Sequence, residues 1–205
     1  MSEAARGHLA MLLFSALVAG SFSLGVLAAD LLAPTALNAV RFLIAGVVIG
    51  ALGWATGAFR RSDLRAPWRY FVLGGLFSAY FVLMFEGLKT APAVSAAAVF
   101  TLTPVMAAGF GWLLLKQRTS QWMVVALAIG AAGALWVIFR ADISALLALN
   151  LGRGEAIYFL GCVSHAIYTP MIARLNEGEN PIAFTFGTLV AGTLILGILG
   201  APAMI

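Results

Sequence analysis

Charge is scarce in this sequence of 205 residues. Only 10% of the residues are Asp, Glu, Lys or Arg, whereas 62% are hydrophobic. An average soluble domain carries about 25% charged residues. A soluble protein of this size needs a polar surface, and too few polar residues are present to make one. The composition therefore excludes an ordinary soluble fold and indicates a protein that lies in lipid.

Cysteine and histidine are also scarce. Cys162 is the one cysteine, so no disulfide can form within the chain, and the two histidines are far apart in the sequence. These residues make no metal-binding motif. The sequence places no pair of carboxylates, and no nucleophile with a nearby base, at the same depth in the membrane. An intramembrane enzyme is therefore disfavoured, and neither a metal nor a cofactor is predicted.

Long apolar runs fill most of the chain. Each run is close to the roughly 20 residues that cross a hydrocarbon core about 30 Å thick. None alternates polar and apolar residues as the strands of a membrane β-barrel do. We therefore predict an all-α integral membrane protein, a multi-pass helical bundle whose first partner is the lipid bilayer. The predicted spans are 8–29, 34–57, 69–89, 92–115, 120–140, 153–174 and 181–203.

Two segments allow another interpretation. The first run could be a cleaved signal peptide with its cleavage site after Ala28, but it is longer than a usual signal core, and Glu3 and Arg6 make a hardly basic start. The connection at 141–152 is the longest after the fourth run. It carries Ile143, Leu146, Leu147 and Leu149, so we predict a short amphipathic segment along the membrane interface.

Basic residues are distributed unevenly between the two sides of the predicted bundle. With a cytoplasmic N-terminus, only Lys89, Arg140 and Arg153 lie outside, which agrees with the positive-inside rule. We predict this orientation in the cell (inner) membrane. The net charge of +4 then follows from topology, so nucleic acid is not a predicted partner. The residues predicted on the cytoplasmic side are Arg6, Arg60, Arg61, Arg65, Arg69, Lys116, Arg118 and Arg174.

A weak internal repeat connects the two parts of the chain. Residues 20–36 recur loosely as residues 165–183, each a span with small and polar residues, then a turn, then a proline that opens the next span. Five spans separate the two starts, and an odd number inverts the second copy in the membrane, as in many secondary transporters. The predicted organisation is a first five-helix repeat (1–140), an interfacial linker (141–152) and the first two helices of an inverted second repeat (153–205).

Residues 85–120 read FEGLKTAPAVSAAAVFTLTPVMAAGFGWLLLKQRTS and precede Gln121-Trp122 and a glycine-containing fifth span. With the spacing from Pro34 to Arg41 and the start Gly154-Glu155-Ala156 of the sixth span, this sequence resembles the drug/metabolite transporter superfamily, EamA type. The likeness covers nearly the whole chain, although its motifs are diffuse patterns of small and apolar residues.

The resemblance implies ten spans in two inverted five-helix repeats, with both termini in the cytoplasm. It implies a secondary transporter that exports small metabolites or drug-like molecules by alternating access. The chain departs from this pattern because it stops after the seventh span and has Gln117 where many members carry glutamate. The alternative is a non-transporting, truncated membrane subunit that assembles with another chain. Association with a second copy of itself is left open.

Arg41 is the strongest candidate for a substrate-binding residue. A charge well inside a span costs about 2.5–3.5 kcal/mol on insertion scales. Arg41 shares a helical face with Asn38, whereas the Gly46-x-x-x-Gly50 motif lies on a nearly opposite face suited to helix packing. The alternative is a permanent ion pair with Glu86, which also has Lys89 three residues away.

The fourth span carries Thr101 and Thr103 next to Pro104, which cannot donate to the Phe100 carbonyl. The freed carbonyl could bind substrate, although a packing kink is the favoured interpretation.

The sixth span places His165, Tyr168 and Thr169 on one face, where the histidine could bind substrate or form an interhelical hydrogen bond. Tyr80 of the third span is a candidate aromatic wall, with core packing favoured. We expect Arg41 and His165 to line one water-accessible cavity for a small-molecule substrate. The full candidate set is Arg41, Asn38, Tyr80, Glu86, Thr101, Thr103, His165, Tyr168 and Thr169.

Overall fold

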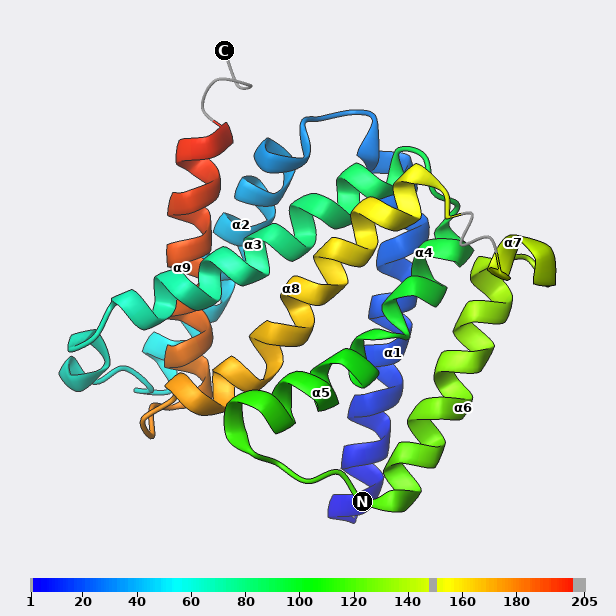
Figure 1. Cartoon of the computed structure of the whole chain (residues 1–205). Helices are drawn as coiled ribbons and strands as arrows, with labels where there is room; N and C mark the ends of the chain where they lie inside the picture. Colours follow the sequence, from blue (N-terminus) through cyan, green and yellow to red (C-terminus); the bar gives the residue numbers. More distant parts are fainter. Residues whose placement is uncertain (1, 148–150, 201–205) are drawn as a thin grey trace.

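The computed structural model describes residues 2–147 and 151–200, and within these ranges the regular structure is helical, with no strand (Figure 1). In these described ranges, seven spans are long and apolar enough to cross a membrane. The predicted all-α, multi-pass membrane fold is confirmed. The spans are α1 (Glu3–Ala29), α2 (Pro34–Ala55), α3 (Trp68–Leu88), α4 and α5 (Ala93–Phe100 and Thr103–Leu115), α6 (Gln121–Ile138), α8 (Arg153–Leu175) and α9 (Pro181–Gly200).

Two short helices lie in the connections. The 3-10 helix η1 (Arg61–Leu64) precedes α3, and α7 (Ile143–Leu147) follows α6 where an interfacial segment is predicted. Asp142 caps α7, since its Oδ1 accepts the backbone N–H groups of Ser144 and Ala145. The hydrogen bond from the Ser144 hydroxyl, together with these backbone bonds, lowers the pKa of Asp142. Leu149 and residues 201–203 of the last predicted span lie outside the described residues.

The fourth span is interrupted rather than merely kinked. α4 ends at Phe100, and α5 starts at Thr103 with Pro104 in its first turn. Proline lacks the N–H that would continue the helical ladder, so the helix breaks one turn before it. The Thr101 hydroxyl donates to the Ala98 carbonyl at 2.6 Å and satisfies part of the broken end.

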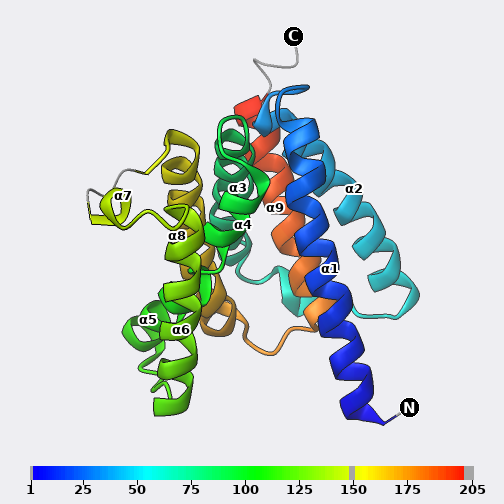
Figure 2. The same ribbon diagram turned by 90° about the vertical axis from the view of Figure 1, so that its right-hand side faces the viewer.

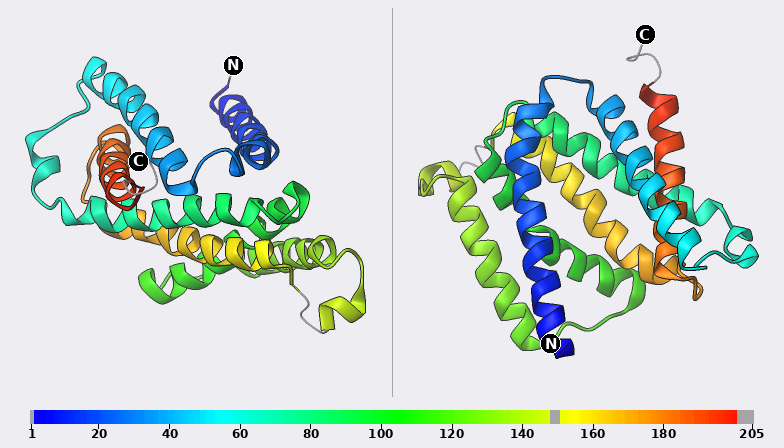
Figure 3. Two further views of the ribbon diagram at one scale, coloured as in Figure 1. Left: turned by 90° about the horizontal axis from the view of Figure 1, so that it is seen from above. Right: turned by 180° about the vertical axis from the view of Figure 1, so that it is seen from behind.

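α3 is the central helix of the bundle. It packs along α8 and against α9, while α2 packs along α9 (Figures 1 and 3). A Cβ added to Gly87 would lie 2.6 Å from the Gly154 carbonyl oxygen, so the backbones of α3 and α8 meet where only glycine fits. Gly46 of α2 faces Leu189 of α9, so the predicted packing face is used as expected.

α1 and α6 lie at the periphery (Figure 2). α1 contacts α3 and α4, and most of its apolar side chains are exposed, as are those of α6. In a bilayer, exposed apolar side chains of this kind face lipid or another membrane helix. The functional interior therefore has to be sought between α2, α3, α4 and α8.

Candidate functional site

One face of α3 carries a stripe of aromatic rings. Phe77, Phe81 and Phe85 recur every four residues and therefore lie on one side of the helix. The rings of Phe77 and Phe81 are 4.9 Å apart between centroids, and Tyr80 lies 4.8 Å from Phe81 in an edge-on arrangement. We call Phe77, Tyr80, Phe81 and Phe85 the α3 aromatic stripe. It forms a continuous apolar wall with one hydroxyl.

Arg41 of α2 lies against one end of this stripe. Its guanidinium carbon is 5.0 Å from the centroid of Phe81 and 4.9 Å from that of Phe85, within the range of cation–π attraction. Its Nη1 donates to Asn38 Oδ1 at 3.2 Å. Asn38 is fully buried, and its Nδ2 donates to the Pro34 carbonyl, which directs Oδ1 toward Arg41. The Arg41 guanidinium is thus held by the Phe81 and Phe85 rings and by the side-chain amide of Asn38.

The alternative ion pair between Arg41 and Glu86 does not form in the structure. Glu86 accepts from Lys89 at 2.7 Å, the local pair that the sequence also offered. In the part of the chain that the structure describes, no carboxylate lies within ion-pair distance of Arg41. Its positive charge is therefore not neutralised by this part of the protein.

His165 of α8 lies farther along the stripe. Its ring is 4.6 Å from Tyr80 and 5.8 Å from Phe100 of α4, and Tyr168 stacks on Phe77 at 4.9 Å. The His165 Nδ1 atom is buried and has no hydrogen-bond partner among the described residues. The structure thus brings Tyr80, His165 and Tyr168 together, as the candidate set requires. From Arg41 through Phe81 and Tyr80 to His165, each neighbour lies within 5.0 Å of the next.

The threonines of the candidate set separate into two groups. The Thr103 hydroxyl is buried and finds no partner within residues 2–147 and 151–200, so it lies inside the bundle. Thr101 and Thr169 are exposed, and their hydroxyls donate to the Ala98 and His165 carbonyls of their own helices. The structure does not bring these two threonines to the interior.

Sequence reasoning missed several residues of this interior. The Tyr158 hydroxyl lies 3.1 Å from that of Tyr80, and the Tyr158 ring packs edge-on against Phe22 of α1. Tyr158 precedes His165 by seven residues, a spacing that puts both on one helical face and could have identified it. The four-residue spacing of Phe81 and Phe85 on α3 was a comparable signal.

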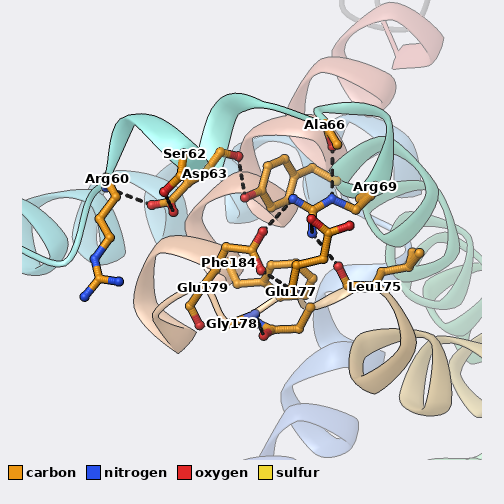
Figure 4. Close-up of polar contacts among 12 residues, drawn as sticks. Arg60, Ser62, Asp63, Ala66, Arg69, Leu175, Glu177, Gly178, Glu179 and Phe184 are labelled. Carbon is orange, nitrogen blue, oxygen red and sulfur yellow. Dashed lines mark hydrogen bonds and ion pairs between the residues drawn. The ribbon is translucent and has the colours of Figure 1, made fainter.

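Another arginine, Arg69 at the start of α3, is buried and bonded to several protein groups (Figure 4). Its Nη1 donates to the Leu175 carbonyl at 2.6 Å, and its Nη2 donates to Glu179 Oε1 at 2.5 Å. Its Nε donates to the Ala66 carbonyl, and Glu177 lies at 3.6 Å. We call Arg69, Leu175, Glu177 and Glu179 the Arg69 clamp. It ties the α8–α9 connection to the start of α3.

Glu179 shows how strongly the clamp stabilises charge. Burial alone raises the pKa of its carboxyl, but the hydrogen bond from Arg69, two backbone N–H bonds and the arginine charge outweigh burial and lower that pKa below its ordinary value. A cavity of about 410 Å³ between α8 and α9 has both Glu179 and Tyr168 in its lining, so it lies between the clamp and the far end of the aromatic stripe.

Comparison with known proteins gives two matches. The sequence profile of the EamA-like transporter family matches residues 5–139. A Bacillus subtilis (strain 168) protein named "Uncharacterized transporter YyaM" is 28% identical over 192 residues, which are 92% of this chain and 63% of that relative. The chain therefore spans less than two thirds of the length of this curated relative. No solved structure matches.

Proposed function

The chain belongs to the EamA-like transporter family of the drug/metabolite transporter superfamily, and on that premise we propose that it works in secondary transport and exports small metabolites or drug-like molecules by alternating access. The family points to a transporter rather than an enzyme. Substrate binds, in this proposal, along the α3 aromatic stripe between Arg41 and His165. The observation that carries the proposal is that Arg41 lies beside an aromatic interior with no carboxylate within ion-pair distance among the described residues, because charged residues inside membrane spans are costly and commonly mark substrate pathways.

We further propose that residues 1–140 form a first five-helix repeat and that residues 153–205 form the first two helices of an inverted second repeat, joined to it by the linker 141–152. The pairing of α2 with α9 supports this organisation, since each is the second helix of its repeat and each begins with a proline. Repeat-related helices that pack together provide the interface around which alternating access takes place. The proposed orientation has the N-terminus in the cytoplasm of the cell (inner) membrane, which places the Arg69 clamp at the cytoplasmic end.

The experiment measures export from cells that express the intact protein. Metabolites in the medium are quantified by mass spectrometry for the wild type and for Arg41→Gln, with Arg118→Gln as the matched control because Arg118 is exposed. We expect one or more compounds whose export is lost in Arg41→Gln only. Equal profiles for the wild type, both variants and cells without the protein would contradict the proposal.

Access to the site is tested separately with cysteine variants. Arg41→Cys and His165→Cys are introduced into a Cys162→Ser background and treated with a water-soluble thiol reagent. We expect both cysteines to react, because a transport path must admit water at both positions. If both resist the reagent in folded protein, Arg41 and His165 do not share a water-accessible cavity.

The second candidate function is a membrane subunit that assembles with another chain and does not transport alone. The exposed faces of α1 and α6 favour it, since Gly20, Gly130 and Gly133 have open space where a side chain or another helix would fit. Native mass spectrometry of the protein extracted from its membrane distinguishes the two functions. A stable complex with a second chain, together with no export by the purified chain in liposomes, would favour the subunit.

A further inference from the structure

We propose that the site beside Arg41 takes organic monoanions with a flat apolar body and no ammonium group, the chemistry of an aryl-substituted carboxylate. The inference rests on the proposed transport function for its physiological meaning, but the binding that it describes can be measured without transport. Charge, geometry and the shape of the aromatic wall each support it.

The positive charge of Arg41 is not balanced by a carboxylate of the described residues. A guanidinium stays protonated, and its partners here are two phenylalanine rings and one amide oxygen. No carboxylate of the described residues lies within ion-pair distance of Arg41. Glu86 of α3 pairs with Lys89, and Glu155 of α8 accepts a hydrogen bond from the neutral Ser95 hydroxyl at 2.8 Å. One positive charge therefore remains, and a ligand with one negative charge balances it.

The geometry of the arginine favours a carboxylate. Arginine has five N–H donors in a planar fork, and within residues 2–147 and 151–200 one of them is used, by Asn38. A carboxylate accepts two parallel bonds from such a fork, which adds strength and orientation. The bond from Asn38 Nδ2 to the Pro34 carbonyl fixes the amide and hence the direction of the guanidinium. Asn38 is a positioning residue in this arrangement.

The aromatic stripe determines the rest of the ligand. Phe81 and Tyr80 extend from Arg41 toward His165, so a flat ring bound to the arginine through its carboxylate would pack against aromatic faces and edges. The far end of this stretch offers two polar atoms: the Tyr80 hydroxyl, which also bonds to Tyr158, and the Nδ1 of His165, which has no hydrogen-bond partner among the described residues. A hydroxyl or carbonyl on the distal side of the ligand would bind there.

The same features disfavour two other classes of ligand. An amino acid brings an ammonium group, which the Arg41 charge repels, and in the described residues no carboxylate lies within ion-pair distance of Arg41. A phosphate ester or dicarboxylate brings two negative charges to a single arginine. Because Arg41 supplies a single positive charge, the site favours ligands with one negative charge over zwitterions and dianions.

The test measures binding to the purified full chain in detergent by isothermal titration calorimetry, with 3-phenylpropionate as the probe. Its amide, 3-phenylpropionamide, keeps the shape and removes the charge, and phenylalanine adds the ammonium group. The amide cannot form the charge-assisted bonds to Arg41, and the ammonium group of phenylalanine is repelled by Arg41, so we expect both analogues to bind at least about tenfold more weakly. An amide that binds as tightly as the acid would overturn the inference.

Two variants assign the binding to Arg41. Arg41→Gln lowers the affinity for 3-phenylpropionate at least about tenfold, whereas Arg118→Gln leaves it unchanged. Asn38→Asp serves if Arg41→Gln does not fold, because it places a carboxylate where the amide oxygen now lies 3.2 Å from Nη1. The internal carboxylate neutralises the arginine, so the probe loses affinity in a folded protein. Unchanged binding in both variants would place the anion site elsewhere.

An anionic lipid headgroup could supply the same negative charge. The titration is therefore repeated in phosphatidylcholine nanodiscs with and without phosphatidylglycerol. We expect the affinity to be the same in both. Loss of binding with phosphatidylglycerol in the wild type would assign Arg41 to a lipid phosphate and overturn the inference.

Failure of the inference and failure of the proposed function give different results. Export that depends on Arg41, without binding of 3-phenylpropionate, would leave transport standing and reject the ligand class. Binding that depends on Arg41, without any export, would keep the ligand class and reject transport.

Discussion

Arg41 and Arg69 are both charged residues within membrane helices, yet their surroundings differ in almost every respect. Arg69 is 1% exposed and bonds to a carboxylate, two backbone carbonyls and, more loosely, a second carboxylate. Arg41 is half-buried, and its guanidinium contacts the rings of Phe81 and Phe85 and donates to the side-chain amide of Asn38. The charge of Arg69 is neutralised by the carboxylates that it binds, so Arg69 stabilises the fold. Arg41 has no carboxylate within ion-pair distance among the described residues, and we propose that it is available for a ligand.

The largest effect is expected from Arg69→Met. Removing one partner of a buried ion pair leaves the other charge without compensation and costs about 3–5 kcal/mol of unfolding free energy. Chemical or thermal unfolding in detergent measures it. Arg65→Met is the matched control, since Arg65 is exposed in the same connection and its loss should change stability by no more than about 0.5 kcal/mol. Similar losses for the two variants would mean that the Arg69 clamp contributes little.

Glu179→Gln removes one charge of the clamp and keeps its shape. The bond from Arg69 then has a neutral acceptor, and we expect a loss of about 1.5–3 kcal/mol. The double variant Arg69→Met/Glu179→Gln should lose clearly less than the sum of the two single variants, because the residues share one interaction. Additive losses would show that the two side chains act independently.

The pH dependence of stability tests the same carboxylate. The pKa of Glu179 is lowered in the folded protein from a reference value of 4.5. Its stabilisation is therefore present in full above the unfolded pKa and is lost as the pH falls through the lower, folded pKa. We expect the Tm difference between wild type and Glu179→Gln to be constant near neutral pH and to shrink below about pH 4.5. A difference that persists unchanged in acid would contradict this assignment.

Asn38→Asp changes the surroundings of Arg41 into those of Arg69. The variant loses the bond from Nδ2 to the Pro34 carbonyl and gains a charged bond to the arginine, so we expect a net gain of about 1 kcal/mol. Unfolding curves measure it. Adding Arg41→Gln should reverse the gain, because the new carboxylate then has no partner. Destabilisation by Asn38→Asp alone would argue that Arg41 is already neutralised.

Arg41→Gln itself should have the smallest effect on stability, within about 1 kcal/mol of the wild type, because no buried carboxylate is left behind. The matched measurement is unfolding of Arg41→Gln beside Arg69→Met. A loss as large as that of Arg69→Met would remove the distinction between the two arginines.

Sequence reasoning predicted the seven membrane spans, which the structure confirms, and it proposed candidate site residues, which stay a prediction. Hydropathy identifies a membrane helix because lipid acts on every residue of the run, so a span such as α3 is recognised without knowledge of its neighbours. Arg41 was identified for the same reason, since a charge inside such a run is conspicuous. Its neighbours Phe81 and Phe85 carried a readable four-residue spacing.

The Arg69 clamp was not readable in the same way. Glu179 lies 110 residues from Arg69 and looks like an ordinary connecting-loop acid, and the bond to the Leu175 carbonyl depends on where α8 ends. The suggested pair of Arg41 and Glu86 failed for the opposite reason. Lys89 is three residues from Glu86 on the same helix, and the local partner needs no tertiary arrangement.

The central claim is that Arg41 keeps an unneutralised charge for an anionic ligand. The most direct measurement is calorimetric titration of 3-phenylpropionate into wild-type and Asn38→Asp protein side by side. The account predicts saturable binding to the wild type and at least about tenfold weaker binding to a folded Asn38→Asp variant. Equal affinities in the two proteins, or no binding to the wild type, would contradict it.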